Sequence, residues 1–593
     1  MVRFDIADCS ADAVAQLCER LGVSDALAQA LVRRGHRDPD AARAFLAADE
    51  RHELEDFPGL PAASELILAR VRSGARVTVH GDYDVDGVCS TAVLVRALRR
   101  LGAHVDWHLP DRAHDGYGLS AATVQRLAAR GTELLITADC AITAVEEVAL
   151  ARSLGIETVV SDHHRPRADG LLPDAPIVHP GLCGYPCTDL CATAVAHKLA
   201  QACVAGSGGD PRELDEDLDL VALATIADVV PLLGENRSLT RRGLRALAAS
   251  SKPGLRALMA VARVDPAKVG ERAVAFALAP RINAAGRLYR ADAALELILT
   301  EDPIRAAQLA EELDRANGER RHTERLIRHE AEAQIAQLPD AGGRWSYVLG
   351  GEGWHPGVIG IVASRLAETH GRPVVLVSLE GERARGSGRS VEAYDLLAGL
   401  TACAEHLDRY GGHSAAAGVE LGRESLAAFA AALERHTASV LAARENTPRE
   451  RVDAIVAGDR LGMELAEELA SLAPFGRGNP SVSLLIRRAV VRDVQPMGEG
   501  RHARFRLEAD GVHARAVAFG CDGRLDVAEG EPVDATFALE VNEWRGVSEP
   551  RLVLRHAQPA SEEATLSPCP TPGQAQSTLF PLPEPIAASA AAI

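Results

Sequence analysis

Short apolar runs alternate with helix-like segments between residues 76 and 161. The runs RVTVH (76–80), ELLITA (133–138) and ETVVS (157–161) have the length and composition of strands, and TAVLVRALRRLG (91–102) repeats apolar residues with the helical period. Strands that alternate with helices pair into parallel, doubly wound sheets. The pattern therefore predicts an α/β domain, and helical periodicity between residues 10 and 75 predicts helices before it.

Three further regions follow this sheet. A long charged helix is predicted at about 302–337, and a smaller α/β domain after it contains the strand-like runs WSYVLGG and PVVLVSL. From about 482 to 557, five runs separated by turn residues predict a small antiparallel barrel. The expected boundaries are 1–270 for the helices and first α/β domain, 271–340 for the connector, 341–445 for the second α/β domain, 446–560 for the barrel and 561–593 for a disordered tail.

The composition indicates a large acidic protein. Its 593 residues carry a net charge of −19 and 47% are hydrophobic, so several separate cores are expected. A protein this acidic is not expected to coat nucleic acid non-specifically, and a polyanionic partner would have to be held by local basic patches or metal ions. No apolar stretch reaches the ~20 residues of a membrane span. The N-terminus does not resemble a signal peptide, so we expect a cytoplasmic protein without membrane contact.

The 11 cysteines are scattered, which favours a reducing compartment over a disulfide framework. Cys183, Cys187 and Cys191 recur every four residues, a spacing that raises the alternative of a zinc or iron–sulfur site. We favour core thiols, because zinc pairings commonly use two-residue gaps and no fourth ligand is evident.

Acidic and histidine side chains follow successive strands of the first α/β domain. The set consists of His80, Asp84, Asp86, Asp139, Asp162, His163, His164 and Asp228. His80 opens the octapeptide HGDYDVDG (80–87), and Asp228 ends an apolar helix predicted within 217–232. Because the carboxyl ends of parallel strands meet at one edge of a sheet, these groups are expected to converge.

Such a cluster needs cations, because carboxylates crowded into one pocket would otherwise protonate or be expelled. Mixed Asp and His ligands favour Mn²⁺, with Mg²⁺ as the alternative, over Zn²⁺. Two divalent ions would lower the pKa of a water molecule and stabilise in-line attack on phosphorus. A calcium loop is excluded, because Thr91 and Ala92 stand beyond the glycine in place of a closing glutamate, and a helix follows. The remaining alternative is that these residues are separate helix caps and turn formers.

The spacing His80-x₃-Asp84-x-Asp86, followed by the other members of the set, resembles the four-motif signature of the DHH phosphoesterase superfamily. The resemblance implies one metal ion on His80, Asp84 and Asp139, and another on Asp86, Asp139, His163 and Asp228, with Asp139 as the bridge. It also implies that His164 contacts the substrate phosphate or donates a proton to the leaving oxygen, while Asp162 orients a neighbour. Asp139, Asp162 and His164 are therefore the expected catalytic residues.

Further motifs resemble one associated domain and one family within this superfamily. The stretch RYGGHSAAAG (409–418) resembles the DHH-associated domain, in which Gly411, Gly412 and His413 would hold the substrate backbone. Residues 30–557 are similar to the RecJ family of bacterial exonucleases, through the stretches PDRAHDGYGLS (110–120), PRINAAGRL (280–288), GWHPGVIGIVASRL (353–366) and APFGRGNP (473–480). This resemblance implies an OB-fold barrel, single-stranded DNA as the substrate and degradation from the 5′ end.

The same resemblance implies a pocket for the terminal 5′-phosphate. Its members would be Arg112, Arg281, Ser387 and Arg389, with Tyr117 stacked on a base or sugar. Guanidinium groups suit a doubly charged terminal phosphate, although arginines that pair with nearby acids are the alternative. In the barrel, the sequence Arg504-Phe505-Arg506 predicts that the phenylalanine faces the core and both arginines face outward.

We therefore expect a 5′→3′ exonuclease of single-stranded DNA that acts in recombination and DNA repair. The enzymatic alternative is a DHH hydrolase of short oligoribonucleotides or cyclic dinucleotides, and a scaffold with an inactive DHH domain is disfavoured because the expected ligands are all present. The resemblance implies a monomer with single-strand-binding protein and a RecQ-type helicase as partners. The segment Gln576–Phe580 resembles the Q-x-x-L-F peptide that docks on the sliding clamp, with chance occurrence as the alternative.

Overall fold

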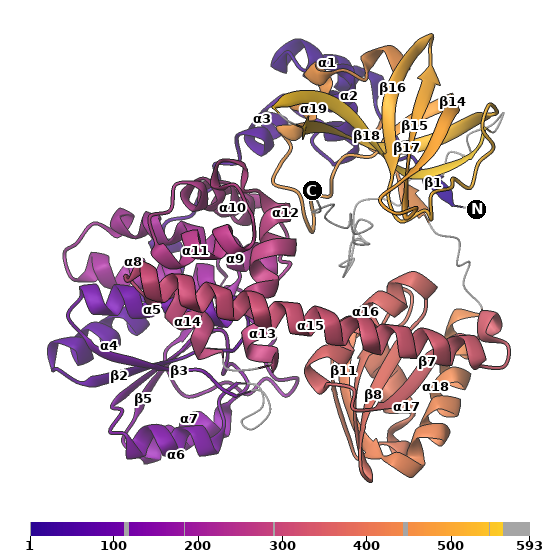
Figure 1. Cartoon of the computed structure of the whole chain (residues 1–593). Coiled ribbons are helices and arrows are strands. Elements are labelled where there is room, and N and C mark those ends of the chain that lie inside the picture. Colours follow the sequence, from indigo (N-terminus) through magenta and orange to yellow (C-terminus); the bar gives the residue numbers. More distant parts are fainter. Residues whose placement is uncertain are drawn as a thin grey trace. The chain divides into compact units, whose positions relative to one another are not determined.

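The computed structural model describes residues 2–111, 118–182, 184–288, 291–442, 449–544 and 546–560. These residues form two compact units (Figure 1). One unit comprises the described residues within 50–443 together with 476–478, and the other comprises the described residues within 1–49, 444–475 and 479–560. The predicted tail 561–593, including Gln576–Phe580, lies outside the described residues. Among the described residues, none of the helices combines the length and the apolarity that a membrane crossing requires.

The first sheet is parallel throughout, with the strand order β3-β2-β4-β5-β6. Its strands are β2 (Arg76–His80), β3 (His104–His108), β4 (Leu134–Thr137), β5 (Glu157–Ser161) and β6 (Ile177–Val178). Helices α4 (Leu60–Arg72), α5 (Val85–Arg100), α6 (Ala121–Ala129) and α7 (Val145–Ser153) alternate with them. The predicted doubly wound sheet is thus confirmed. The order reverses at β2, and sheets of this kind bind ligands beyond the strand ends at such a switch point.

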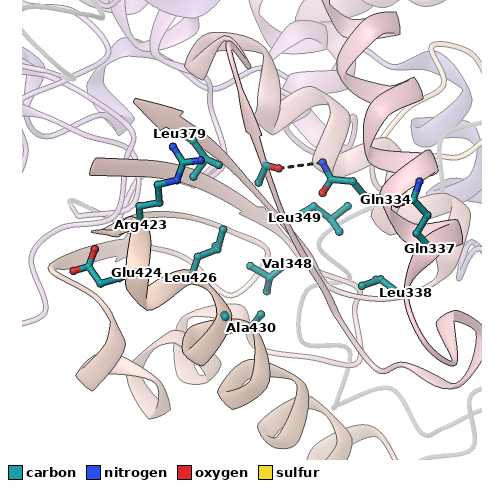
Figure 2. A pocket seen from close by; sticks show the side chains of 12 residues that line it. Gln334, Gln337, Leu338, Val348, Leu349, Leu379, Arg423, Glu424, Leu426 and Ala430 are labelled. Atoms are coloured by element: carbon teal, nitrogen blue, oxygen red, sulfur yellow. Dashed lines mark hydrogen bonds between the residues drawn. The ribbon is translucent and has the colours of Figure 1, made fainter. Parts of the chain in front are cut away.

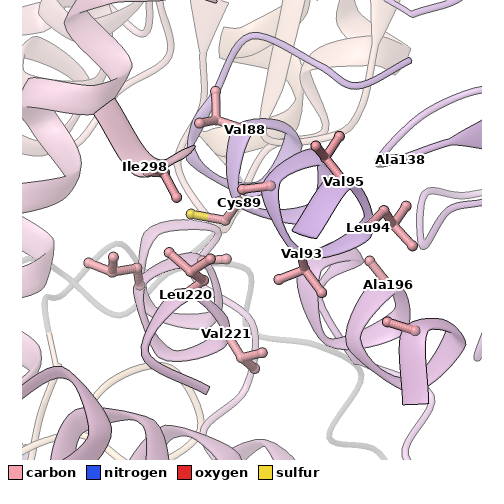
Figure 3. Close-up of a cluster of buried hydrophobic side chains, with 14 of the residues drawn as sticks. Val88, Cys89, Val93, Leu94, Val95, Ala138, Ala196, Leu220, Val221 and Ile298 are labelled. Carbon is pink, nitrogen blue, oxygen red and sulfur yellow. The ribbon is translucent and has the colours of Figure 1, made fainter. Parts of the chain in front are cut away.

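Helix α5 runs through the centre of the first domain's core. Its sequence VCSTAVLV (88–95) has no charged face, so the helix must be covered by its neighbours. Figure 3 shows side chains of α5 beside Leu220 and Val221 of α9 (Leu218–Ala227), Ala196 of α8 (Ala192–Gly206) and Ile298 of α14 (Asp292–Leu299). This packing fixes the N-terminal end of α5, where Asp84 and Asp86 lie.

The predicted connecting helix is α15 (Pro303–Gln337), whose 35 residues are preceded by the capping residue Asp302. At 1.5 Å per residue it spans roughly 50 Å. Leu309 and Leu313 near its start belong to the core of the first domain, and Ile327 and Ile335 near its end belong to a second core. The helices between the first sheet and α15 also include α10 (Gly234–Ala248), α11 (Pro253–Val261), α12 (Glu271–Ala273) and α13 (Ala279–Leu288).

The second α/β domain has a mixed sheet with the order β10-β11-β9-β8-β7. Its strands are β7 (Tyr347–Glu352), β8 (Val374–Glu380), β9 (Arg383–Arg389), β10 (Arg409–Gly412) and β11 (Ala416–Gly422). Helix α16 (Pro356–His370) and the end of α15 share one core with the sheet, and α17 (Leu396–Ala402) and α18 (Leu426–Leu441) share another. The predicted smaller α/β domain is confirmed.

The C-terminal barrel closes because β14 pairs with both β15 and β17, giving the circuit β14-β15-β16-β18-β17. These strands are β14 (Leu484–Met497), β15 (His502–Ala509), β16 (Val512–Ala518), β17 (Pro532–Trp544) and β18 (Val547–Pro559), and α19 (Met463–Ala470) precedes them. The short β13 (Ala454–Ile455) pairs with β14. As predicted, Phe505 is buried in the barrel core, while Arg504 and Arg506 are exposed.

The N-terminal helices depart from the domain boundaries expected from the sequence. Helices α1 (Ala11–Leu21), α2 (Asp25–Arg33) and α3 (Pro39–Ala47) share a core with the barrel rather than with the first sheet. Leu17, Leu27 and Leu31 are buried there, and β1 (Arg3–Asp5) pairs in parallel with β12 (Arg449–Arg451). An amphipathic helix shows that it buries an apolar face but not which distant domain covers that face, so neighbourhood in sequence was a poor guide.

Candidate metal centre

Acidic side chains gather beyond the carboxyl ends of β2, β4 and β5. His80 is the last residue of β2, and Asp139 and Asp162 follow β4 and β5. Asp84 caps the N-terminus of α5, and Asp228 follows α9. Asp139 has a φ of 69°, a left-handed conformation that is uncommon outside glycine and that clusters at functional sites. The predicted convergence at the switch point is therefore present.

The oxygen atoms of three aspartates surround one imidazole nitrogen. His163 Nε2 lies 3.2 Å from Asp139 Oδ1, 3.7 Å from Asp86 Oδ2 and 3.8 Å from Asp228 Oδ2. Among the described residues, three overlapping groups have ligand atoms within 4.8 Å of one another: Asp139 with His163 and His164, Asp86 with His163 and Asp228, and Asp82 with Asp84 and Asp139. Asp139 and His163 each belong to two of these groups, and a carboxylate can bridge two ions because it has two oxygen atoms.

The electrostatics of the cluster test whether a metal fits. Burial raises the pKa of Asp139 well above its ordinary value, and the charges of Asp86 and Asp84 raise it further. Burial and the same two neighbours also raise the pKa of Asp228 well above its ordinary value. Carboxylates crowded in this way ionise together only if positive charge lies among them. Divalent cations would supply that charge, and Asp and His donors suit Mn²⁺ and Mg²⁺, so the residues fit the predicted ions.

His164 and Asp162 form a hydrogen-bonded pair beside the cluster. Asp162 Oδ1 lies 2.8 Å from His164 Nδ1 and accepts the backbone N–H groups of His163 and His164 at 2.7 and 3.0 Å. Burial opposes the charge on both groups, but their mutual hydrogen bond lowers the pKa of Asp162 to about 2 and raises the pKa of His164 to about 9. This hydrogen bond orients the His164 ring, and the catalytic roles that the resemblance implies for Asp162 and His164 stay predictions.

His80 and Asp82 lie in different surroundings. The His80 ring is buried, its Nε2 lies 3.3 Å from the Gly118 carbonyl oxygen, and it stacks on His108. Among the described residues, His80 belongs to none of the three ligand groups, so its metal role stays a prediction. Asp82, which lies outside the spacing His80-x₃-Asp84-x-Asp86, is buried and belongs to a group with Asp84 and Asp139. Its place in the same octapeptide was the signal available.

Sequence reasoning missed Thr193, which holds Asp86. Both Asp86 oxygens accept backbone N–H groups at the start of α8, from Ala192 and Thr193, each at 2.7 Å. The Thr193 hydroxyl adds a third bond of 2.6 Å to Asp86 Oδ1. The N-cap residue of α8, Cys191, offers no side-chain cap, so Asp86 takes that function from a distant segment.

Replacing Thr193 with valine is expected to weaken Mn²⁺ binding and catalysis. Valine has the same shape but no hydroxyl, so Asp86 loses one of its hydrogen bonds while the helix keeps its backbone donors. Loss of such a supporting bond typically costs about 10- to 100-fold in metal affinity or activity. Calorimetric Mn²⁺ titration would measure the effect. Thr437→Val, at a buried threonine of the second α/β domain, is the matched control and is expected to bind Mn²⁺ normally.

The structure places Ser387 and Arg389 side by side on β9. Arg389 Nη1 donates to Ser387 Oγ at 2.9 Å and to the Gly388 carbonyl oxygen at 2.8 Å. Gly360 of α16 faces them, and a Cβ at that position would lie 2.9 Å from both Arg389 Nη2 and Ser387 Oγ. The missing side chain therefore leaves the room that Ser387 and Arg389 occupy beside α16. We call this pair of polar groups the cradle on β9.

The glycine-rich stretch that contains β10 and His413 is influenced by positive charges near the acidic cluster. Burial lowers the pKa of His413, and the positive charges of Arg165 and His164 lower it further. Gly412 has a φ of 140°, and a Cβ there would lie 2.5 Å from the Ala416 carbonyl oxygen, so glycine is required. Gly411 is exposed and has nothing within 4 Å of an added Cβ.

The other predicted phosphate ligands are Arg281, Arg112 and Tyr117, and the structure describes only the first of them. Arg281 is bound to Asp314 of α15 by its Nε and Nη2 atoms at 2.9 and 2.8 Å, and its Nη1 donates to the Ala277 carbonyl oxygen at 2.6 Å. This is the alternative weighed from the sequence, an arginine paired with a nearby acid. Its role in phosphate binding stays a prediction. Arg112 and Tyr117 lie outside the described residues.

A cavity of about 520 Å³ lies apart from the predicted site residues (Figure 2). Its walls come from the end of α15, from β7 and from α18, including Leu349 and Leu426. Gln334 Nε2 donates to the Gly350 carbonyl oxygen across one side at 3.0 Å. None of the predicted metal or phosphate ligands lines this cavity, so it is not the centre described above.

Three domain families match the chain. Residues 76–225 match the DHH family, N-terminal domain, residues 342–439 match the DHHA1 domain, and residues 452–556 match the RecJ OB domain. These matches cover the parallel-sheet domain, the second α/β domain and the barrel. The predicted combination of DHH, DHH-associated and OB-fold domains is therefore confirmed.

Curated relatives match over most of the chain. It is 34% identical over 567 residues to the single-stranded-DNA-specific exonuclease RecJ of Bacillus subtilis, covering 94% of this chain and 71% of the relative. Its identity to the exonuclease of the same name from Escherichia coli is 34%, covering 85% and 91%. Among solved structures, RecJ from Thermus thermophilus in complex with Mn²⁺ matches with a TM-score of 0.82 and 32% identity, covering 94% of this chain and 80% of that chain. The Mg²⁺ complex from the same organism matches with a TM-score of 0.77 and 31% identity, covering 94% and 79%.

Proposed function

Because the chain belongs to the RecJ family of single-stranded-DNA-specific exonucleases, we propose that it is a metal-dependent exonuclease that degrades single-stranded DNA from the 5′ end. The observation that carries this proposal is the set of aspartate oxygens around His163 Nε2 at the switch point of the parallel sheet. A phosphodiesterase needs concentrated positive charge at the scissile phosphate, and this cluster is built to hold it as metal ions.

The proposed ligand sets are His80, Asp84 and Asp139 for one ion, and Asp86, Asp139, His163 and Asp228 for the other. Solved relatives hold Mn²⁺ or Mg²⁺, which supports Mn²⁺ with Mg²⁺ as the alternative for this chain. When bound, two such ions would supply an activated water and stabilise the charge that develops at phosphorus. Asp86 is kept in place by α8, and Asp84 by the N-terminal turn of α5.

His164 is proposed to hold a proton for the leaving oxygen. Its Nδ1 faces Asp162, so Nε2 is the atom that can donate toward substrate. The raised pKa of His164, about 9, keeps the ring protonated at neutral pH. Asp162 carries no proton itself in this arrangement, because its pKa is lowered to about 2. Asp162 therefore acts by orientation and charge, in support of a general acid.

The polarity is proposed from the cradle on β9. Ser387 and Arg389 would bind the terminal 5′-phosphate, and Gly411, Gly412 and His413 would contact the substrate backbone. A terminal phosphate carries more charge than an internal diester, so a guanidinium in this cradle would select the end of a strand. Arg112, Arg281 and Tyr117 remain proposed members of this pocket.

Two alternative functions, a hydrolase of short nucleotides and an inactive scaffold, explain fewer features of the chain than an exonuclease does. A hydrolase of short oligoribonucleotides or cyclic dinucleotides needs no single-strand platform, whereas this chain has a barrel that matches the RecJ OB domain. An inactive scaffold would not need to keep so many ionisable groups in one costly cluster. The exonuclease is therefore favoured over both.

The biological setting is proposed from the family. Single-stranded DNA is the substrate, and we propose roles in recombination and DNA repair beside single-strand-binding protein and a RecQ-type helicase. The sliding clamp would bind through Gln576–Phe580. The monomeric state and the cytoplasmic location stay predictions.

The deciding experiment uses a long single strand labelled at its 3′ end, with Mn²⁺ and the full chain. Stepwise shortening from the 5′ end, with duplex DNA left intact, is the expected result. Dinucleotides and short oligoribonucleotides are assayed beside it. Hydrolysis of these short substrates without shortening of the long strand would overturn the proposed substrate, and shortening from the opposite end would overturn the polarity.

A further inference from the structure

Helix α13 contacts residues 83–86 at two places, and we call this segment, which contains the proposed ligands Asp84 and Asp86, the metal-binding loop. Val85 lies between Asp84 and Asp86, and its backbone N–H donates to Asn283 Oδ1 at 3.1 Å. One turn further along α13, a Cβ on Gly286 would lie 2.5 Å from the carbonyl oxygen of Tyr83. The helix therefore touches the residues on both sides of Asp84, from a segment far away in the sequence.

The Val85 N–H has no acceptor within α5, and Asn283 supplies one. The first N–H groups of a helix have no partners within that helix. In α5, the Asp84 carboxylate accepts the Gly87 N–H at 3.0 Å, and the Asp84 carbonyl accepts the Val88 N–H at 2.9 Å. The Val85 N–H is the first of the helix, and Asn283 supplies its acceptor.

Helix α13 is itself held firmly. Ile282 and Ala285 are buried in the same core as α5. Arg281 binds Asp314 of α15, and Arg287 Nη1 donates to the Gly357 carbonyl oxygen at 3.0 Å. Because α13 is held in place, the Asn283 side chain can hold the Val85 N–H in a defined position.

We infer that Asn283 is a positioning residue for the metal centre. By holding the peptide between Asp84 and Asp86, it sets the relative orientation of two carboxylates that are assigned to different ions. The close approach of Gly286 to Tyr83 restrains the same loop from its other side. The inference rests on the proposed function for the reaction that the ions serve, but Mn²⁺ binding can be measured without DNA.

The test of this inference measures Mn²⁺ binding to the full chain by calorimetry. It also records the electron paramagnetic resonance spectrum of the bound ions. Asn283→Ala is expected to bind Mn²⁺ about 10- to 100-fold more weakly and to change the spectrum of the coupled pair. Asn283→Asp keeps an acceptor for Val85 and is expected to restore the spectrum. Asn236→Ala is the matched control, because Asn236 is buried in the same domain and donates to the Asp189 carbonyl oxygen at 2.7 Å.

A second variant tests the position of the loop without removing a hydrogen bond. Alanine is a better helix former than glycine, so Gly286→Ala is not expected to weaken α13 itself. Its methyl group would displace the Tyr83 carbonyl and is expected to weaken Mn²⁺ binding by about tenfold or more. Gly318→Ala in α15 is the control, since nothing lies within 4 Å of a Cβ there.

The outcomes separate the inference from the proposed function. Weakened binding in Asn283→Ala and Gly286→Ala, with normal binding in both controls, supports the inference even if DNA degradation fails in the wild type. Wild-type Mn²⁺ affinity and an unchanged spectrum in both variants would overturn it. Equal losses in Asn283→Ala and Asn236→Ala would also overturn it, because they would reflect general loss of stability.

Discussion

Replacing Asp139 with asparagine is expected to abolish DNA degradation and, at the same time, to raise the melting temperature of the metal-free protein. The activity should fall about a thousandfold or more, because a bridging ligand supports several kcal/mol of charge stabilisation in the transition state. Asparagine suits the site sterically, since it also tolerates the left-handed conformation that Asp139 adopts at φ 69°. The change therefore removes charge with little change in shape.

The gain in stability follows from the raised pKa of Asp139. Burial, then Asp86 and Asp84, hold its folded pKa well above the unfolded value. A group of this kind contributes its full stability below the unfolded pKa of about 4 and loses it as the pH rises through the folded pKa. Neutral pH lies above the unfolded pKa, so the raised pKa of Asp139 opposes folding there unless cations are bound. Asparagine mimics the protonated form, so its advantage should shrink as the pH falls toward about 4.

Thermal melts with and without Mn²⁺ measure both effects. Each kcal/mol corresponds to about 2–4 °C for a domain of about 150–250 residues and to a smaller shift for a larger unit. The wild type is expected to gain stability from Mn²⁺ and the variant to gain little. Asp219→Asn is the control at a buried aspartate outside the acidic cluster, because Asp219 is paired with Lys252 at 2.9 Å. Mn²⁺ is expected to stabilise this variant as much as it stabilises the wild type. Equal stabilisation of wild type and Asp139→Asn by Mn²⁺ would contradict the bridging role.

Replacing Arg389 with alanine is expected to remove the preference for strands that carry a 5′-phosphate. A hydrogen bond to a charged group contributes about 1.5–3 kcal/mol, which corresponds to roughly 10- to 150-fold in binding. The KM for a 5′-phosphorylated strand should rise by that factor, while the KM for the matching 5′-hydroxyl strand should change little. Ser387→Ala should act in the same direction with a smaller effect, because a neutral donor is weaker.

The control for this prediction lies on the same strand. Arg385 of β9 is exposed and is 3.6 Å from Glu420, so Arg385→Ala changes the net charge equally without touching the cradle. The assay compares both substrates for wild type, Arg389→Ala and Arg385→Ala over a range of salt concentrations. If Arg385→Ala impairs the phosphorylated strand as strongly as Arg389→Ala does, general electrostatic attraction and not a phosphate pocket would explain the preference.

The sequence by itself determined the elements and the chemical character of the site. Strand and helix periods depend on neighbours a few residues apart, so the parallel sheet, the long helix and the alternation around Phe505 could be predicted from local patterns. The convergence of Asp139 and Asp162 could also be predicted, because parallel topology brings strand ends together whatever the details of packing. Motif spacing also indicated the family, because the ligands of one site keep fixed separations along the chain.

The tertiary structure alone decided which distant residues support that site. Thr193 and Asn283 hold Asp86 and Val85 from helices that follow much later in the chain, and Arg281 is paired with Asp314. The N-terminal helices join the barrel core for the same reason. Such contacts depend on how whole elements pack, and an apolar face or a hydrogen-bonding side chain indicates the need for a partner without specifying which one.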